Sequence, residues 1–386
     1  MKIESGIFKN RKNKDLQEVI VFGTGYFGMM ITYLCRYAGI RVAYCLDNNL
    51  PQKGKVIFDE VVCKVPCYEN NLPIVISMRN EKTAREVYEQ CVQLGYTDII
   101  RIDHEKLESE FYKLPDKEFC ELRYALRFDG KLPDLNNPKT FNEKLQWLKL
   151  YDRNPKYTMM VDKYAVKEYI AREVGNEYVI PTLGVWKSFE EIDFDKLPNQ
   201  FVLKCTHDSG SVIVVKDKKN FEKEEARKTI KNALNKNFFV ESREWPYKNV
   251  VPQIIAEKYI VDESGIELKD YKVFVFEGKA KIIQVDYDRF IDHKRNLYTL
   301  NWEYIDLAIE YPTDPRRKIE KPKQLCKMLE IAEQVAVGIP HVRVDFYSVG
   351  DKIYFGEMTF YHESGLGVFE PEEWNLKLGE WIVLPN

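Results

Sequence analysis

Two short segments near the C-terminus place charged side chains at alternating positions. Arg343 and Asp345 alternate with apolar residues in the first segment, and Glu357 and Thr359 flank a methionine in the second. A turn at Gly350 would fold the segments into a hairpin, so Glu357 and Thr359 are predicted to lie close to Asp345. Mg²⁺ prefers one or two carboxylates together with phosphate oxygens. The hairpin is therefore a candidate Mg²⁺ and phosphate site, with a surface hairpin of solvated charges as the alternative.

A glycine-rich segment directly follows the apolar run Glu18–Phe22 and precedes a helical pattern. In this context Gly23 permits a tight turn, Gly25 lets the backbone approach a phosphate, and Gly28 allows close packing. Asp47 ends the next predicted strand, where an acidic side chain could hold a ribose hydroxyl. The pattern favours a nucleotide-type ligand over an empty scaffold, and NAD is only one candidate.

Two further segments have residues suited to a nucleotide. In Phe201–Val215 a small polar loop lies between two apolar segments, and Lys204 could reach phosphates that the loop amides cover. A plain hairpin with a glycine turn is the alternative. A later apolar strand runs into Glu257 and Tyr259, which could face an adenine edge and a ribose. An ordinary interior strand is the alternative there.

A charged segment contains Arg289, His293 and Arg295 within seven residues, a composition that suits anion recognition. A guanidinium is well shaped for bidentate capture of a carboxylate. A solvated loop is the alternative, since runs of charge usually face water. His362, just past the hairpin, could orient an incoming amine, although a lone histidine is more often structural.

The elements that would position these residues follow two patterns. Over residues 18–103 strands alternate with helices, which is typical of a parallel, doubly wound sheet. Residues 105–150 are predicted to be helical, with a capping box at Thr140, and Val161–Val174 is predicted to be a further helix. Later strands are predicted at 201–205, 212–216, 254–260, 271–276, 280–286, 341–347 and 353–359, and later helices at 222–235 and 323–337.

Composition limits the class of protein. A chain of 386 residues has room for two or three domains with large cores. A net charge of -3 provides no basic field for nucleic acid or an anionic membrane. No apolar run approaches membrane-spanning length. The eight cysteines include no Cys-x-x-Cys pair, which argues against zinc and for the reducing cytoplasm.

The order of the motifs resembles that of ATP-grasp enzymes, in which two lobes clamp ATP. A helix beginning near Lys163 is followed by a strand lysine with a glycine loop, a hinge strand and a carboxylate pair. The chain is most similar to the TupA-like ATP-grasp family, named for teichuronopeptide biosynthesis, over about residues 115–386. The segments that carry this resemblance are NPKTFNEKLQWLKLYDRNP, DKYAVKEYI, IPTLGVW, FVLKCTHDSG, DRFIDHKRNLY and YFGEMTFYHESG.

The N-terminal segments VIVFGTGYFG and LDNN resemble the nucleotide-sugar-binding domain of bacterial sugar O- and N-acetyltransferases. The two resemblances imply an α/β fold, with a Rossmann-like parallel-sheet domain followed by a two-lobed ATP-grasp α+β domain. The implied boundaries are a polar tail at 1–14, a nucleotide- or nucleotide-sugar-binding domain at 15–105, a helical connector at 106–150 and an ATP-grasp catalytic domain at 151–386.

The ATP-grasp resemblance also implies which residues act. ATP would contact Lys163, Lys204, His207, Ser209, Gly210, Glu257, Tyr259 and Asp270. Asp345, Glu357 and Thr359 would bind Mg²⁺, and one or two ions stay possible because Thr359 stands where many ATP-grasp enzymes carry Asn. The substrate carboxylate would be held by Arg289, His293 and Arg295, and catalysis would involve Arg343, Arg289 and His362.

The implied reaction has two steps. A carboxylate attacks the γ-phosphate of ATP to give an acyl phosphate and ADP, and an amine then displaces phosphate to form an amide. With the nucleotide-sugar-like N-terminal segment, this implies a cytoplasmic ligase acting on a uronic acid in capsule or other cell-surface polysaccharide biosynthesis. Its partners would be ATP, Mg²⁺, a free or nucleotide-linked uronic acid, an amine and other biosynthetic enzymes, with no nucleic acid or membrane span.

Three other functions stay open. An NAD(P)-dependent nucleotide-sugar oxidoreductase would use Gly23–Gly28 and leave the rest of the chain without a role. A sugar or polysaccharide kinase would stop at phosphoryl transfer. A binding protein with a degenerate ATP site is favoured only by Thr359, whereas Lys204, Asp345 and Glu357 argue against it.

Overall fold

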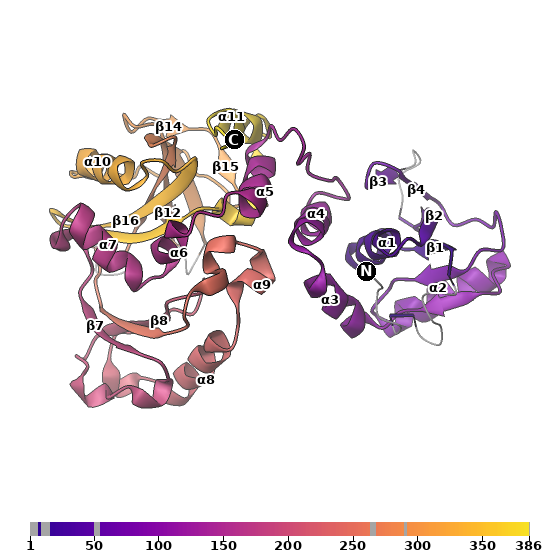
Figure 1. Ribbon diagram of the computed structural model, residues 1–386, viewed down its shortest axis with the longest axis horizontal. Helices are drawn as coiled ribbons and strands as arrows, with labels where there is room; N and C mark the ends of the chain where they lie inside the picture. Colours follow the sequence, from indigo (N-terminus) through magenta and orange to yellow (C-terminus); the bar gives the residue numbers. More distant parts are fainter. Residues whose placement is uncertain (1–6, 9–15, 50–54, 263–267, 289–291, 386) are drawn as a thin grey trace. The chain divides into compact units, whose positions relative to one another are not determined.

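The computed structural model describes residues 7–8, 16–49, 55–262, 268–288 and 292–385. The chain divides into two compact units, residues 1–134 and 135–386, and each is described by itself (Figure 1). None of the helices in the described ranges combines the length and the apolar character that a membrane span requires.

The first unit is built on a six-stranded sheet with the order β3-β4-β2-β1-β5-β6. The strands are β1 (Glu18–Phe22), β2 (Arg41–Leu46), β3 (Lys55–Ile57), β4 (Val61–Lys64), β5 (Ile74–Ile76) and β6 (Ile99–Arg101). All neighbours pair in parallel except β3, which is antiparallel to β4. The predicted parallel sheet is therefore seen in part. Strands β3 and β4 were not predicted, because neither forms the fully buried apolar run that marks β5.

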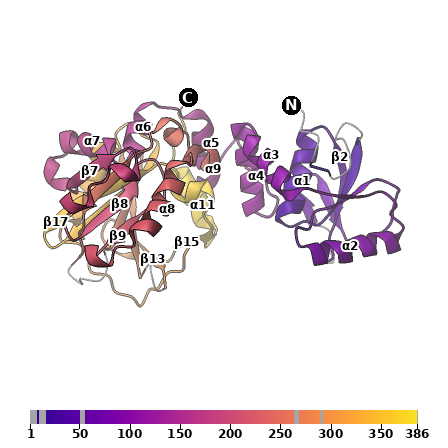
Figure 2. The same cartoon turned by 90° about the horizontal axis from the view of Figure 1, so that it is seen from below.

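The described residues of the first unit also form four α-helices. They are α1 (Tyr26–Tyr37), α2 (Glu81–Leu94), α3 (His104–Lys113) and α4 (Asp116–Arg127). Helices α1 and α2 lie on opposite faces of the sheet (Figure 2). Side chains of α2 pack in one core with Ile20 and Phe22 of β1, a strand that is apolar almost throughout because both of its faces are covered.

The second unit contains a small antiparallel sheet with the order β7-β10-β8-β9. Its strands are β7 (Thr182–Trp186), β8 (Phe201–Cys205), β9 (Ile213–Val215) and β10 (Ile254–Lys258). Helix α8 (Lys223–Leu234) contributes Ala226, Ile230 and Ala233 to the core that covers this sheet. Strand β8 alternates, with Phe201 and Leu203 in the core, so Lys204 points away from it.

A larger antiparallel sheet of the second unit has the order β14-β13-β12-β11-β16-β17. Its strands are β11 (Asp270–Phe276), β12 (Lys279–Tyr287), β13 (Lys294–Tyr298), β14 (Tyr304–Ile305), β16 (His341–Val349) and β17 (Lys352–Thr359). The other elements are α5 (Phe141–Tyr151), α6 (Lys156–Val161), α7 (Ala165–Glu173), α9 (Phe238–Ser242), α10 (Leu325–Val335), α11 (Glu373–Glu380), β15 (Ala308–Ile309) and β18 (Phe369–Glu370).

Two local predictions for the second unit have opposite outcomes. The capping box is confirmed, because the Thr140 hydroxyl accepts from the amide of Glu143 and the Glu143 carboxylate accepts from the amide of Thr140. The single helix Val161–Val174 is wrong, since α6 ends at Val161 and α7 begins at Ala165. Asp162 ends α6 in an extended conformation, and its carboxylate accepts from the amides of Tyr164 and Ala165 at 2.8 and 3.2 Å, where α7 begins.

Candidate active site

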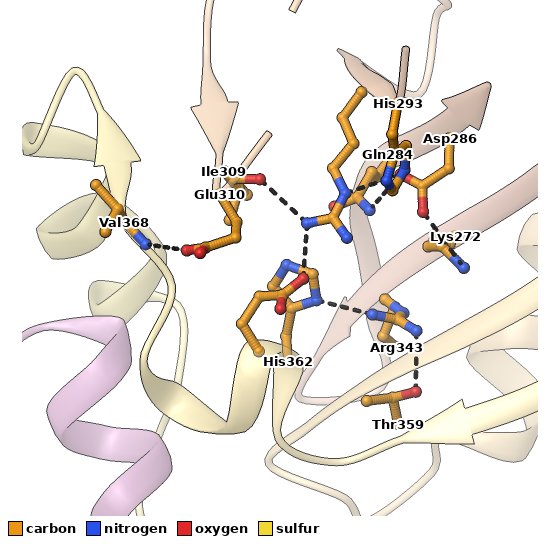
Figure 3. Close-up of polar contacts among 12 residues, drawn as sticks. Lys272, Gln284, Asp286, His293, Ile309, Glu310, Arg343, Thr359, His362 and Val368 are labelled. Atoms are coloured by element: carbon orange, nitrogen blue, oxygen red, sulfur yellow. Dashed lines mark hydrogen bonds and ion pairs between the residues drawn. The ribbon is translucent and has the colours of Figure 1, made fainter. Parts of the chain in front are cut away.

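The predicted hairpin brings its charged residues together. Asp345 of β16 pairs directly with Glu357 of β17, and Arg343 pairs with Thr359, so the predicted closeness of Glu357 and Thr359 to Asp345 is confirmed. Arg343 holds Asp345 in a bidentate ion pair, with Nε to Oδ1 and Nη2 to Oδ2 both 2.7 Å. Its Nη2 also donates to the Thr359 hydroxyl at 3.1 Å (Figure 3). The same Nη2 lies 3.6 Å from the Glu357 carboxylate.

A second buried cation, Lys272 of β11, binds the same carboxylate. Its Nζ lies 2.8 Å from Asp345 Oδ2, 3.1 Å from Asp270 Oδ2 and 3.8 Å from Asp286 Oδ2. Burial pushes the pKa of the Asp345 carboxyl upward, but Arg343 and Lys272 together outweigh it and hold that pKa below its usual range. Burial opposes the charged form of Lys272, yet Asp270 and Asp345 leave its pKa raised. Sequence reasoning assigned Lys272 no role.

The oxygen ligands of the hairpin suit Mg²⁺, but they are not equally accessible. Both Asp345 oxygens already accept from cations, whereas the Glu357 side chain is 45% exposed. Within the described parts of the chain, no group of three or more His, Cys, Asp or Glu residues is arranged to hold a metal ion. Glu357 and the neighbouring Thr359 hydroxyl are therefore the ready ligands, and Asp345 would join them by exchanging an ion pair.

On the small sheet, Glu257 of β10 joins two lysines. Its carboxylate lies 2.6 Å from Nζ of Lys204 on β8 and 2.6 Å from Nζ of Lys167 on α7. Burial raises the pKa of the Glu257 carboxyl, but Lys204 and Lys167 outweigh it, and the pKa stays below its usual value. The structure thus brings Lys204 and Glu257 together. Lys167 was not predicted, because only the fold of α7 onto the sheet places it there.

This buried ion-pair triad makes stability depend on Glu257. We expect Glu257→Gln to lower the free energy of unfolding by about 3–5 kcal/mol at neutral pH, because two lysines lose a buried partner. Since the folded carboxyl has a lowered pKa, its contribution is present above the ordinary value of 4.5 and is lost as pH falls through the folded pKa. The difference between wild type and variant should therefore shrink in acid, as measured by urea unfolding across pH.

The matched control is Glu190→Gln, which removes an exposed carboxylate paired with Lys231 at 2.7 Å. A screened surface pair contributes little, so this variant should unfold close to wild type. Equal unfolding midpoints for Glu257→Gln and Glu190→Gln at neutral pH would contradict the prediction.

The predicted polar loop after β8 lies beside Lys163. The amide of Lys163 donates to the carbonyl of Thr206 at 3.0 Å, and its Nζ donates to the carbonyl of Asp208. Within the loop, Ser211 Oγ donates to the Asp208 carboxylate at 2.7 Å. Burial lowers the pKa of Lys163, while the charge of Glu357 acts in the opposite direction. Lys163 is therefore bonded to the loop and also influenced by the charge of Glu357 in the hairpin.

The remaining residues predicted to contact ATP occupy different surroundings. Ser209 and Gly210 are exposed at the tip of the loop, and Gly210 has a positive φ of 111°. His207 is buried, and its Nε2 lies 3.1 Å from the carbonyl of Ala233 in α8. Tyr259 is half-buried just after β10. Asp270, at the start of β11, is buried and ion-paired with Lys272, as described above, so it lies with the hairpin charges.

Arg295 of β13 is held by two carboxylates. Its Nε donates to Asp286 at 2.9 Å and its Nη1 donates to Glu363 at 2.7 Å, while the guanidinium lies 4.5 Å from the ring centre of Tyr311. His293 is half-buried, with Nε2 3.8 Å from Asp286. The predicted Arg289 lies outside the described residues. Sequence reasoning missed Asp286 and Glu363. Asp286 is the direct partner of Arg295 across the neighbouring strands β12 and β13, whereas Glu363 meets Arg295 across 68 residues of sequence.

His362 lies against Arg343, in the group of polar contacts that also includes Asp286 (Figure 3). Its Nδ1 is 2.8 Å from Arg343 Nη1, and because a guanidinium only donates, Nδ1 carries no proton. Burial, followed by the charges of Arg343 and Arg295, holds the imidazole pKa well below its ordinary value. His362 is therefore a neutral acceptor that fixes the orientation of Arg343.

The first unit contains the glycine segment and Asp47. A Cβ on Gly23 would lie 2.2 Å from Ser77 Oγ, and one on Gly28 would lie 1.9 Å from the carbonyl oxygen of Gly23. A Cβ on Gly25, the residue before α1, would meet nothing within 4 Å. The Asp47 carboxylate accepts from the amide and hydroxyl of Thr24 at 2.8 and 2.7 Å, so it fastens the glycine segment to the end of β2.

Comparisons with known proteins identify a family for most of the second unit. The model of the family described as TupA-like ATPgrasp matches residues 143–383, which is more than half of the chain. No curated protein matches the sequence. Among solved structures, a D-alanine–D-alanine ligase from Bacillus anthracis is 17% identical with a TM-score of 0.32, and the match covers 89% of this chain and 86% of that chain.

Two other solved structures are similar at the same level. The ATP-grasp ligase PsnB is 11% identical with a TM-score of 0.30, covering 90% of each chain. N5-carboxyaminoimidazole synthase from Aspergillus clavatus is 12% identical with a TM-score of 0.30, covering 90% of this chain and 71% of that chain. Likeness at these values assigns no substrate.

Proposed function

Because the chain belongs to the TupA-like ATP-grasp family and is thus an ATP-dependent ligase that uses ATP and Mg²⁺, we propose that it joins a carboxylate to an amine through an acyl phosphate. The observation that carries this proposal is the hairpin, where Arg343, Asp345, Glu357 and Thr359 converge. In this arrangement the guanidinium can bind the oxygens of a phosphoryl group, and the neighbouring carboxylates can bind the Mg²⁺ ion that accompanies it.

The lysines support a nucleotide beside the hairpin. We assign Lys163 and Lys204 to the phosphates of ATP, with the loop 206–211 covering them, and Glu257 and Tyr259 to the adenosine end. The charge of Glu357 affects Lys163, as does that of Lys204, so these groups belong to one electrostatic environment. The ion pair of Lys204 with Glu257 keeps the ammonium in place while no phosphate is bound.

The chain's own residues then account for the first step. Arg343, fixed by Asp345 and His362, would face the phosphoryl group while that group is transferred from ATP to the acceptor carboxylate. Mg²⁺ held by Glu357, Asp345 and Thr359 would neutralise phosphate charge when bound. A neutral His362 neither repels Arg343 nor competes for the phosphoryl group. The amine would attack in the second step, within a site that excludes water.

We propose that the acceptor is the carboxylate of a uronic acid, free or nucleotide-linked, in capsule or other cell-surface polysaccharide synthesis in the cytoplasm. The support is the cationic segment of the sequence that contains Arg289, His293 and Arg295, because such a segment suits a carboxylate. In the structure Arg295 already binds Asp286 and Glu363, so an incoming carboxylate would share this guanidinium.

The test measures ADP release from ATP and Mg²⁺ with UDP-glucuronic or UDP-galacturonic acid and a panel of amines. We expect ADP release over many turnovers only when both a uronic acid and a suitable amine are present, because ADP formed with the acyl phosphate alone is limited to one turnover. The product should have the mass of the amide. Phosphate attached to the product would indicate a kinase instead. No ADP release with any combination would contradict the ligase proposal.

We further propose that the first unit binds the nucleotide part of a nucleotide sugar at Gly23, Gly25 and Gly28. The open space at Gly25 is the supporting observation, because a side chain there would occupy the approach to the α1 N-terminus without disturbing the fold. Calorimetric titration should show UDP-sugar binding to the wild type and weaker binding to Gly25→Val. Binding of NAD(P) but not of UDP-sugars would overturn this assignment.

A further inference from the structure

The turn that carries His362 and Glu363 has an unfavourable backbone. Glu363, Ser364 and Gly365 have successive positive φ angles of 47°, 57° and 65°. Side-chain-bearing residues rarely adopt this left-handed conformation, and it persists only where the surroundings enforce it. The turn nevertheless presents His362 to Arg343 and Glu363 to Arg295, so its shape determines how both arginines are held.

Three buried polar side chains of α5 hold this turn. Lys149 donates to the carbonyl and hydroxyl of Ser364 at 2.7 and 2.8 Å, and also lies 3.2 Å from the carbonyl of Ser242. Gln146 donates to the carbonyls of Ser364 and Gly365 at 3.0 and 2.8 Å.

The third of these side chains is Asn142, which donates to the carbonyl of Gly367 at 2.8 Å. Spacings of four and three residues place Asn142, Gln146 and Lys149 on one face of the helix. All three have an exposure of 1% or less, although amide and ammonium groups are costly to bury unless they are hydrogen-bonded. Helix α5 and the turn are in close contact, because a Cβ on Gly365 would lie only 2.6 Å from Gln146 Nε2.

We propose that Lys149, Gln146 and Asn142, here called the α5 clamp, are positioning residues that set the geometry of Arg343 and Arg295 through the turn. This inference rests on the proposed function, in which Arg343 faces the transferred phosphoryl group. The bonds of these residues described above reach Ser364, Gly365 and Gly367, so each acts by fixing the backbone beside an acceptor. The nucleotide-side residues Lys204 and Glu257 are not bonded to the clamp.

The separation between turn and nucleotide predicts a distinctive kinetic effect. Lys149→Met should lower kcat about 10- to 100-fold, as expected when the partners that orient an active-site group are lost. The KM for ATP should stay close to wild type, because the lysines near Glu257 keep their contacts. Because a smaller folded fraction would also lower the apparent kcat at an unchanged KM, kcat is normalised to the folded fraction, which circular dichroism measures.

Lys144→Met is the matched control. Lys144 lies on the same helix and donates from Nζ to the carbonyl of Ile382 at 2.7 Å, away from the turn. It loses the same kind of lysine–carbonyl bond, so wild-type kcat is expected in the folded variant. Equal kcat values for wild type, Lys144→Met and Lys149→Met would overturn the proposal. If Lys149→Met does not fold, Gln146→Leu, which keeps the bonds of Lys149, takes its place with the same expectation.

A second measurement does not depend on turnover. The chain has five histidines, and ¹⁵N labelling with assignment by His362→Gln would identify the ring of His362. In wild type and Lys144→Met, its Nδ1 signal should be that of an unprotonated acceptor. In Lys149→Met or Gln146→Leu, the two nitrogens should shift toward a solvent-exchanging ring. An unchanged His362 signal overturns the clamp, whereas absent turnover in wild type with the expected shift overturns only the ligase assignment.

Discussion

Glu357→Gln should abolish ATP-dependent turnover and leave the protein folded. The side chain is 45% exposed and its ionic contact is with Arg343 at 3.6 Å, so little stability depends on it. Of the two paired carboxylates Asp345 and Glu357 it is the more accessible, so it is the residue through which Mg²⁺ would be held. Losing metal charge stabilisation is expected to cost several kcal/mol, or about 1,000-fold in kcat. Steady-state ADP release over a range of Mg²⁺ concentrations measures this effect.

The control for this prediction is another carboxylate of the same hairpin. Asp351, at the turn, is 77% exposed and pairs with Lys323 at 3.2 Å. Asp351→Asn should retain wild-type kcat and the same Mg²⁺ requirement. Wild-type turnover by Glu357→Gln would falsify the metal assignment. If the variant needs more Mg²⁺ but reaches the wild-type kcat at saturating Mg²⁺, Glu357 contributes to the affinity for the metal and not to the rate of the chemical step.

The second large effect is expected for Arg343→Met, which should impair both catalysis and folding. Removing the guanidinium leaves Asp345 buried with Lys272 alone, which should cost about 3–5 kcal/mol of unfolding free energy. Losing a fixed donor for transition-state charge should lower kcat by about 100- to 1,000-fold. Urea unfolding and single-turnover kinetics measure the two effects separately.

Two companion variants separate charge from geometry. Arg343→Lys keeps a cation but loses the bidentate fork, so it should regain part of the stability and little of the activity. Arg343→Met with Asp345→Asn removes both members of the pair, so this double variant should be more stable than Arg343→Met alone. If the double variant is the less stable of the two, or Arg343→Lys has wild-type kcat, the proposed role of the ion pair is wrong.

Local patterns predicted the parts of the site that lie within one supersecondary unit. Alternation and the Gly350 turn placed Glu357 opposite Asp345, because a hairpin between neighbouring strands needs only local information. The glycine segment before α1 was found in the same way, because the tight turn and close packing there require glycines at neighbouring positions of the sequence. The predicted helix Val161–Val174 was wrong because apolar spacing does not show that the backbone becomes extended at Asp162, where α6 ends before α7 begins.

The sequence by itself therefore determined the hairpin, the loops and the family, whereas the tertiary structure decided which charges meet. Lys272 reaches Asp345 across 73 residues because β11 pairs with β16, and Lys149 reaches Ser364 across 215 residues because α5 packs on the turn. No local spacing encodes these neighbours. An unpaired buried charge is costly, so each buried charge has partners that the fold places beside it. The partners of Arg343 are therefore set by strand order and helix packing.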